Sequence, residues 1–310
     1  MTYSNGVITL IEVWTCMQRF SLDGLPARVP AFNKGVIPMQ LKLKDKVVVL
    51  TGAASGIGAA MSDRLAAKGA RLALIDKSGN ALGETLDRAR SAGATATGYV
   101  LDITDRAAVA DLPDRVMADH GRATVLVNGA GVTLLGTFDQ TTLEEFDWVM
   151  DVNFNAMVRM THAFLPLLQQ QPQAHICNIS SLFGLIALPS QAAYAASKFA
   201  ARGFSEGLRH ELEGSNVGLT VVHPGGVNTA IARDARVPSS TTPEEAEARK
   251  ARAAKLLKTP PEKAADQIIA AIEKRQPRLL IGRDARMGDR IQRLFPASYW
   301  SKMKGFVNDK

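Results

Sequence analysis

Residues 47–58 read VVVLTGAASGIG, an apolar run followed at once by a turn with glycines at positions 52, 56 and 58. An unbroken apolar run is typical of a strand buried on both faces of a sheet. Glycine permits a tight turn and lets the backbone approach a phosphate, and the helix that follows offers free N–H groups. These residues therefore predict a dinucleotide-binding turn between a first strand and a first helix.

The chain after this turn continues to alternate short apolar runs with amphipathic stretches. Seven strands separated by helices imply right-handed crossovers and a parallel sheet covered on both faces. We therefore predict an α/β fold, a doubly wound parallel seven-stranded sheet of the Rossmann type. The predicted strands are residues 47–50, 72–75, 96–101, 124–128, 175–179, 219–223 and 278–281. The predicted helices include residues 57–68, 80–92, 106–120, 143–170 and 191–212.

The pattern of strands and helices also predicts how the chain divides. We expect one domain for dinucleotide binding and catalysis over residues 39–282. Residues 1–38 carry prolines at positions 26, 30 and 38 and show no clear period, so we predict an N-terminal extension that is dispensable for folding. Residues 283–310 form a basic tail with arginines at helical spacing.

Composition excludes several classes of protein. Apolar residues make up 46% and charged residues 22% of the chain, which argues against a disordered or fibrous protein. Only two cysteines, Cys16 and Cys177, are present, so a disulfide-stapled secreted scaffold is excluded and a cytoplasmic location is expected. No uncharged apolar window of about 18 residues exists, which argues against a membrane-spanning helix.

The net charge of +7 is a local feature of the chain. Residues 1–232 hold 19 Lys and Arg against 20 Asp and Glu, so the basic excess lies entirely after residue 232. No nucleic-acid motif accompanies this charge, and we expect no nucleic-acid partner. The five histidines are scattered without ligand spacing, so no metal is expected either.

Asp76 ends the second predicted strand, 18 residues after Gly58. A carboxylate at this place can accept hydrogen bonds from the adenosine ribose hydroxyls and repels a 2′-phosphate. The sequence therefore favours NAD over NADP. Lys77 follows directly and offsets part of the repulsion, which leaves NADP as the alternative cofactor.

Tyr194 and Lys198 stand four residues apart at the start of a predicted helix, so their side chains share one face. A nearby ammonium favours the ionised form of a phenol, which makes the pair a suitable acid/base device for an alcohol. Upstream, a predicted buried strand ends at Ser180 and Ser181, which brings hydroxyl groups to the carboxyl edge of the sheet.

These motifs together resemble the short-chain dehydrogenase/reductase family, and the resemblance spans residues 45–282. The family's glycine signature falls on Gly52, Gly56 and Gly58. Its serine, tyrosine and lysine fall on Ser181, Tyr194 and Lys198, and its catalytic asparagine on Asn153, with Asn155 as a lesser candidate. The family's Asn-Asn-Ala-Gly motif reads Asn-Gly-Ala-Gly at residues 128–131, so its second asparagine is replaced by glycine.

The resemblance implies a role for each matched residue. Tyr194 is the general acid/base, and Lys198 holds the nicotinamide ribose and lowers the pKa of the tyrosine. Ser181 binds the substrate oxygen, and Asn153 holds a water in a proton relay. The implied cofactor-binding residues are Gly52, Ser55, Gly56, Ile57, Gly58, Asp76, Asp102, Ile103, Asn128, Ala130, Gly131, Tyr194, Lys198, Pro224, Gly225, Val227 and Thr229.

The resemblance also places a substrate lid at residues 230–259. We expect this segment to be largely exposed and mobile, because its centre is polar and charged. An apolar substrate, such as a secondary alcohol or ketone, fits the side chains expected near the site, which are Val132, Leu134, Phe183, Leu185, Leu188 and Ile231.

The basic tail allows three interpretations. It packs on the domain or on a second subunit, it contacts an anionic membrane peripherally, or it is solvated. The family resemblance implies a homodimer or homotetramer.

The leading functional hypothesis is an NAD(H)-dependent oxidoreductase that interconverts a secondary alcohol and a ketone. The alternatives are an NADPH-dependent carbonyl or ketoacyl reductase and a cofactor-binding protein without turnover. The presence of Ser181, Tyr194 and Lys198 argues against the last of these.

Overall fold

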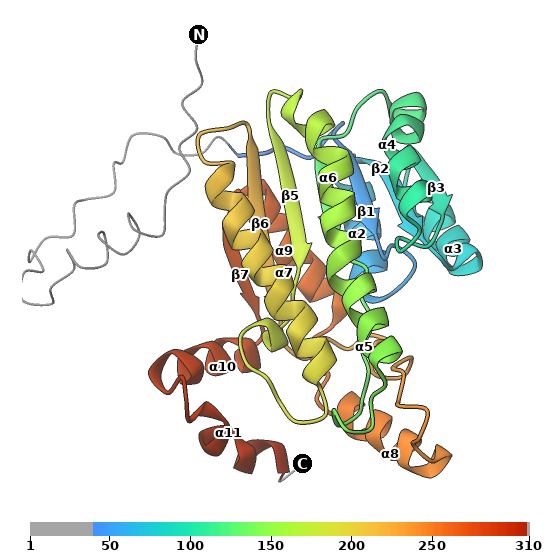
Figure 1. Cartoon of the computed structure of the whole chain (residues 1–310). Coiled ribbons are helices and arrows are strands. Elements are labelled where there is room, and N and C mark those ends of the chain that lie inside the picture. Colours follow the sequence, from blue (N-terminus) through green and yellow to red (C-terminus); the bar gives the residue numbers. More distant parts are fainter. Residues whose placement is uncertain (1–39, 309–310) are drawn as a thin grey trace, which may run out of the picture. The chain divides into compact units, whose positions relative to one another are not determined.

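Seven parallel strands form one sheet in the order β3-β2-β1-β4-β5-β6-β7 (Figure 1). The computed structural model describes residues 40–308, and the predicted extension and Cys16 lie outside this range. The strands are β1 (Val47–Thr51), β2 (Arg71–Asp76), β3 (Ala96–Val100), β4 (Val125–Asn128), β5 (Ala174–Ile179), β6 (Val217–Pro224) and β7 (Arg278–Ile281). The predicted doubly wound parallel sheet is confirmed.

Helices cover both faces of this sheet (Figure 1). One face is covered by α2 (Gly56–Ala67), α3 (Gly79–Ser91) and α9 (Pro261–Glu273). The other is covered by α4 (Arg106–His120), α6 (Ala156–Gln169) and α7 (Ala192–Glu211). Alternate side chains of β1 enter the two cores: Val48 and Leu50 face α2 and α9, and Val47 and Val49 face α4 and α6. Burial on both faces explains why the strands read as unbroken apolar runs.

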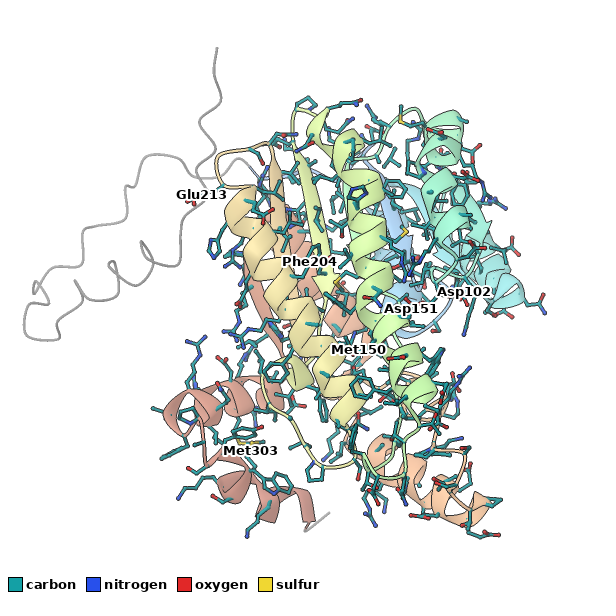
Figure 2. The ribbon with its side chains drawn as sticks, in the orientation of Figure 1. Asp102, Met150, Asp151, Phe204, Glu213 and Met303 are labelled. Carbon is teal, nitrogen blue, oxygen red and sulfur yellow. The ribbon has the colours of Figure 1, made fainter. Side chains whose placement is uncertain are left out.

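The region predicted as one regular helix over residues 143–170 differs in the structure. It consists of α5 (Leu143–Met150), a π-helical turn η2 (Asp151–Asn155) and α6. Figure 2 labels Met150 and Asp151 where α5 passes into this turn, and Phe204 on the neighbouring α7. Single π-helical turns inside α-helices are frequent at functional sites, and this one contains Asn153.

The last part of the chain adds three helices near the carboxyl ends of the strands (Figure 1). They are α8 (Pro243–Ala254), α10 (Arg283–Leu294) and α11 (Tyr299–Asn308). The predicted lid segment contains α8, and Arg249 of this helix donates to the Leu135 carbonyl and the Gln140 side chain, both at 2.9 Å. Among the described residues, no helix is both long and apolar enough to cross a bilayer.

Candidate active site

The glycine-rich turn lies between β1 and α2, at the point where the strand order of the sheet reverses. Strand β1 pairs with β2 on one side and with β4 on the other, so the crossovers leave in opposite directions. Ligands of doubly wound proteins bind outside the carboxyl ends of the strands at this switch point. The fold therefore places the predicted dinucleotide turn where a ligand is expected.

Three glycines shape this turn because side chains do not fit there. Gly52 and Gly56 have positive φ angles of 71° and 51°, a conformation that other residues adopt only with strain. A Cβ on Gly58 would overlap the Gly52 carbonyl oxygen, and one on Gly56 would press on Thr229. The contact with Thr229 shows that the loop after β6 lies against the turn.

The start of α2 is open to an anion. Its N-cap, Ser55, is exposed and makes no side-chain cap, so the helix's first N–H groups have no capping side chain among the described residues. An uncapped helix N-terminus behind a glycine turn is a phosphate-binding arrangement. Ile57 is half-buried beside it, packed against the core.

Thr51 is a functional candidate that the sequence analysis did not single out. Its hydroxyl accepts hydrogen bonds from the backbone N–H groups of Gly129, at 3.0 Å, and Ala130, at 3.2 Å. The side chain thereby ties the end of β1 to the turn after β4. Its position directly before the first glycine of the turn is the sequence feature that could have identified it.

Two aspartates predicted for cofactor binding follow β2 and β3. The Asp76 carboxylate accepts from the backbone N–H of Ala54 in the glycine turn, at 3.0 Å, and from that of Ser78, at 3.0 Å. Burial opposes ionisation of Asp102, but hydrogen bonds from Thr104 and the charge of Lys77 hold its pKa below the usual value. Hydrogen bonds therefore fix both carboxylates near the carboxyl ends of β2 and β3, and the predicted residue Ile103 follows Asp102 in the chain.

Asn128 is the buried last residue of β4, and its side chain crosslinks neighbouring elements. Its amide nitrogen donates to Asn178 of β5, at 2.8 Å, and to Thr161 of α6, at 3.1 Å. The Asn128 side chain thus joins β4 to β5, and Gly131, shortly after it, lies beside the predicted site residues Asn153 and Lys198.

The π-helical turn directs Asn153 toward the centre of the site. Its Oδ1 accepts from the Val132 N–H at 2.8 Å, and its Nδ2 donates to the Val132 carbonyl and to Ser197 Oγ, both at 2.9 Å. Asn153 is fully buried, whereas Asn155 is exposed and donates to Asp151. The geometry distinguishes the two candidates, because only Asn153 reaches the predicted cluster.

Tyr194 and Lys198 begin α7 beside Ser181, which follows β5. The ammonium of Lys198 lies 5.7 Å from the Tyr194 ring centre and donates to the Ile179 carbonyl at 3.1 Å. All three functional side chains are buried, with 9%, 3% and 7% exposure for the tyrosine, lysine and serine. The structure thus brings the predicted triad together at the carboxyl edge of β5.

Burial controls the protonation of this triad. It lowers the pKa of Lys198 to about 8. Burial also raises the pKa of Tyr194, and a hydrogen bond with Ser181 acts in the opposite direction. The pKa of Tyr194 therefore lies above its usual value, because desolvation of the phenolate is the larger of these two effects.

The predicted residue Pro224 ends β6, and the loop after it contains the predicted residues Gly225, Val227 and Thr229. Gly225 donates to the Ile281 carbonyl of β7 at 2.9 Å, and Val227 is buried in the core. His223, just before the loop, is fully buried and its Nδ1 lies 3.0 Å from the Ser181 carbonyl oxygen. As the carbonyl can only accept, the ring donates this bond and links β6 to Ser181, the predicted catalytic serine.

The apolar side chains expected near the substrate divide into two groups. Leu134 and Leu185 are buried in the protein interior, at 2% and 1% exposure. The other four, Val132, Phe183, Leu188 and Ile231, are half-buried. The Phe183 ring meets that of Tyr194 edge to face at 5.6 Å, so an apolar wall stands next to the phenol.

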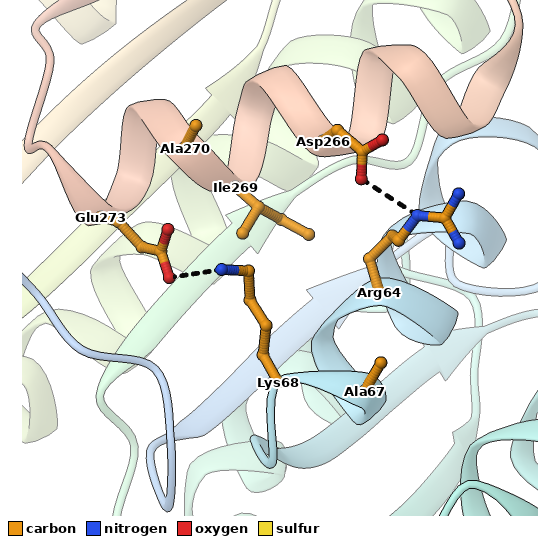
Figure 3. A pocket seen from close by; sticks show the side chains of 7 residues that line it. All are labelled: Arg64, Ala67, Lys68, Asp266, Ile269, Ala270 and Glu273. Carbon is orange, nitrogen blue, oxygen red and sulfur yellow. Dashed lines mark hydrogen bonds and ion pairs between the residues drawn. The ribbon is translucent and has the colours of Figure 1, made fainter.

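A hollow of about 350 Å³ lies elsewhere, between α2 and α9 (Figure 3). Two ion pairs cross it, Arg64 with Asp266 at 3.0 Å and Lys68 with Glu273 at 2.9 Å. Its polar groups satisfy one another, and none of the predicted site residues lines it. Among residues 40–308, no three His, Cys, Asp or Glu side chains are grouped to hold a metal ion.

The sheet, the glycine turn at its switch point and the buried tyrosine–lysine pair define a class of nicotinamide-dependent oxidoreductases. A family model described as short chain dehydrogenase matches residues 46–239. The oxidoreductase SadH of Mycobacterium tuberculosis is 40% identical over 257 residues, which are 82% of this chain and 92% of SadH. The chain therefore belongs to the short-chain dehydrogenase/reductase family and is an NAD(P)-dependent oxidoreductase.

Solved structures of this family carry either cofactor. A short-chain dehydrogenase/reductase from Burkholderia phymatum in complex with NAD is similar with a TM-score of 0.77 and 31% identity, covering 82% of this chain and 95% of that one. A metagenomic short-chain oxidoreductase in complex with NADP has a TM-score of 0.64 and 28% identity, covering 78% and 98%.

Proposed function

We propose that this protein uses NAD(H) to interconvert a secondary alcohol and a ketone, with Tyr194 as the general acid/base. The observation that carries the proposal is the meeting of Tyr194, Ser181 and Lys198 at the carboxyl edge of β5, next to the glycine turn. A phenol, a hydroxyl and an ammonium in one water-poor place can move a proton at a substrate oxygen and stabilise charge on that oxygen.

Tyr194 takes the hydroxyl proton of the alcohol in one direction and returns it to the carbonyl oxygen in the other. Ser181 donates a hydrogen bond to the same oxygen while negative charge develops there. Lys198 holds the nicotinamide ribose, and Asn153 holds a water that passes protons toward Lys198. When bound, the nicotinamide accepts or supplies the hydride.

The residues of the glycine turn fit a dinucleotide. Side chains are excluded at Gly52, Gly56 and Gly58, and the open start of α2 suits the pyrophosphate. The preference for NAD is supported by the Asp76 carboxylate, which hydrogen bonds orient beside the turn. An NADPH-dependent carbonyl or ketoacyl reductase is the alternative, and the exposed Lys77 is the feature that favours it.

An apolar substrate is supported by two half-buried residues that contact the site, Phe183 and Val132. Phe183 stands against the Tyr194 ring, and Val132 is joined to Asn153, so both flank the position of the reacting oxygen. Apolar groups with a few convergent polar ones are typical of small-molecule sites.

The experiment is a panel of secondary alcohols and ketones, assayed with NAD(H) and NADP(H), for the wild type and for Tyr194→Phe. Loss of the phenol should reduce kcat by about 10²- to 10⁴-fold, the usual contribution of a general acid/base, and leave NADH binding unchanged. Tyr99→Phe is the matched control, because its hydroxyl bonds Asp119 away from the triad. Turnover retained by Tyr194→Phe would contradict the proposed role.

We also propose a homo-oligomer in the cytoplasm. The family resemblance supports a homodimer or homotetramer, and the low cysteine content of the sequence supports the location. Light scattering after size exclusion measures the assembly, and a molar mass equal to one chain would exclude it.

A further inference from the structure

The two C-terminal helices contact both loops that flank the proposed active site. Helix α10 reaches the loop after β6, which lies against the glycine turn through Thr229. Helix α11 reaches the segment between Ser181 and Tyr194. These contacts come from the end of the chain, beyond the last strand of the sheet.

On the cofactor side, the carboxylate of Asp284 in α10 contacts the glycine-rich loop after β6. Asp284 Oδ2 accepts a hydrogen bond of 2.6 Å from the Gly226 backbone N–H. A Cβ on Gly225 or on Gly282 would overlap this carboxylate, so the backbone of both loops is shaped around it. The short bond to a charged acceptor holds residues 224–226 in one conformation.

On the substrate side, the hydroxyl of Tyr299 in α11 forms two hydrogen bonds with the backbone of Ala187. Tyr299 Oη accepts from the Ala187 N–H at 3.0 Å and donates to the Ala187 carbonyl at 3.2 Å. A Cβ on Gly288 of α10 would press on Leu182, so α10 also packs closely on the start of the same segment. Met303, labelled in Figure 2 on α11, is also buried, so this helix has a side that is shielded from solvent.

We propose that Asp284 and Tyr299 are positioning residues, Asp284 for the cofactor-facing loop after β6 and Tyr299 for the substrate-facing segment 182–191. This inference rests on the proposed function. It assigns the C-terminal helices a part in the active site that the family motifs, which end before them, do not include. The two residues act on different ligands, so their effects should separate.

The test compares Asp284→Ala and Tyr299→Phe by NADH fluorescence titration, by steady-state kinetics and by melting temperature. Asp284→Ala should weaken NADH binding about tenfold, as expected for a lost hydrogen bond to a charged group. Asp284→Asn keeps an oxygen acceptor and should restore most of this loss. Tyr299→Phe should raise the substrate KM several-fold and leave NADH binding unchanged. Lys302→Gln, exposed on α11, is the control and should change neither.

The separation of the two effects decides the proposal. If Asp284→Ala binds NADH like the wild type, or if both variants change only the melting temperature, the positioning roles are wrong. If the wild type itself neither binds nor turns over a nicotinamide cofactor, the proposed function fails instead. Because NADH binding is measured without turnover, the two failures are distinguishable.

The outward side of α10 carries an independent feature, a face that is both basic and apolar. Arg283, Arg286, Arg290 and Arg293 are exposed at helical spacing. Met287 and Leu294, on the same face, are 43% and 72% exposed, and Phe295 at its end is 43% exposed. Of the two acidic residues of the helix, Asp284 bonds Gly226, and Asp289 bonds both Arg278 of β7 and Arg293 of its own helix.

We infer that this face docks on an anionic lipid surface. Residues 283–308 hold six Lys and Arg against two Asp, and Asp289 pairs with only one arginine of the face, Arg293, so the outward charge is predominantly basic. Exposed apolar side chains beside arginines are the composition of helices that lie in a membrane interface. A surface contact here would deliver apolar substrates near the proposed site.

The test is co-sedimentation with phosphatidylcholine vesicles, with and without phosphatidylglycerol. The wild type should bind only the anionic vesicles, and binding should fall with salt. Replacing Arg286, Arg290 and Arg293 with Gln should weaken binding about a hundredfold, since each basic residue near such a surface contributes about fivefold. Changing Lys250, Arg252 and Lys255 on or beside α8 to Gln is the control with equal charge removed.

Three outcomes would overturn the lipid proposal. They are no binding of the wild type to anionic vesicles at low salt, equal loss in the α8 control, and a change of oligomer mass in the α10 variant without vesicle binding. The last result would assign the face to a second copy of the chain.

Discussion

Asn153 and Lys198 meet at Gly131, although the three residues belong to different parts of the fold. A Cβ added to Gly131 would lie 3.3 Å from both Asn153 Oδ1 and Lys198 Nζ. Each polar group is also held by the main chain, Asn153 by Val132 and Lys198 by the Ile179 carbonyl. The absence of a side chain at residue 131 therefore keeps open the space between a carboxamide and an ammonium.

Gly131→Ala should lower kcat about tenfold, which corresponds to about 1.4 kcal/mol in the activation barrier. The added methyl group would push Asn153 and Lys198 out of their positions, since 3.3 Å is tighter than an ordinary contact. Gly203→Ala on α7 is the control, because nothing lies within 4 Å of the added Cβ. That change should stabilise the helix by about 0.5–1 kcal/mol and leave kcat unchanged. Steady-state kinetics and thermal melting measure both, and a wild-type kcat in Gly131→Ala would show that the space is not needed.

Ser181→Ala should move the pH profile of alcohol oxidation upward. Oxidation needs the deprotonated phenol, so the rate rises as pH passes through the pKa of Tyr194. Burial raises this pKa, and the hydrogen bond with Ser181 lowers it, so removing the bond leaves the raising effect unopposed. The measurement is kcat/KM from about pH 8 to 11, a range that includes the ordinary tyrosine pKa of about 10 and values above it. Ser180→Ala should keep the wild-type midpoint because its hydroxyl donates to the Lys198 carbonyl instead. An unchanged midpoint in Ser181→Ala would separate the serine from the ionisation of Tyr194.

The strands and the centre of the site were predictable because their physical causes are local in the sequence. Burial on both faces makes each strand a continuous apolar run, and all seven predicted runs are strands. The glycine turn follows β1 directly. Tyr194 and Lys198 are neighbours on one turn of α7, so four-residue spacing places them together.

Three features could not be predicted from the sequence, because they depend on residues distant in the chain or on burial in the folded protein. Helix α8 buries only Ala246, so its sequence lacks the apolar periodicity that predicts a helix. Its only sequence signals are the N-cap Thr242 and Pro243 at the first helical position. The bond between Asp284 and Gly226 joins residues far apart in the chain. The direction of the pKa shift of Tyr194 depends on how completely the phenol is desolvated, which spacing does not reveal.

Asp76→Asn should change cofactor preference without releasing the glycine turn. The amide keeps an oxygen that can accept from the Ala54 N–H, but it removes the charge that repels a 2′-phosphate. The ratio of kcat/KM for NAD over NADP should fall about tenfold, equivalent to about 1.4 kcal/mol. Lys77→Gln should shift the ratio the other way, because it removes an exposed cation beside the same site. A ratio that neither variant changes would assign cofactor preference to other residues.

Acid should destabilise the fold through two buried neutral histidines. Burial lowers the pKa of His175 to about 3 and that of His223 to about 4. The unfolded chain binds a proton at each near pH 6.5 while the folded chain does not, so this stability is present above about pH 6.5 and is lost as pH falls toward the folded pKa values.

Between about pH 6.5 and 5, each histidine should cost about 2 kcal/mol of unfolding free energy. His175 Nε2 donates to Thr220 Oγ1, which itself donates to the Gln276 carbonyl, and burial together with the charge of Arg275 keeps the ring neutral. His175→Gln should be less stable than the wild type at neutral pH, yet its loss between pH 7.5 and 5 in urea unfolding should be about 2 kcal/mol smaller. His162→Gln is the control, because this histidine is exposed and its replacement leaves the two buried histidines in place. If His175→Gln shows the full wild-type loss on acidification, buried His175 is not a source of the acid sensitivity.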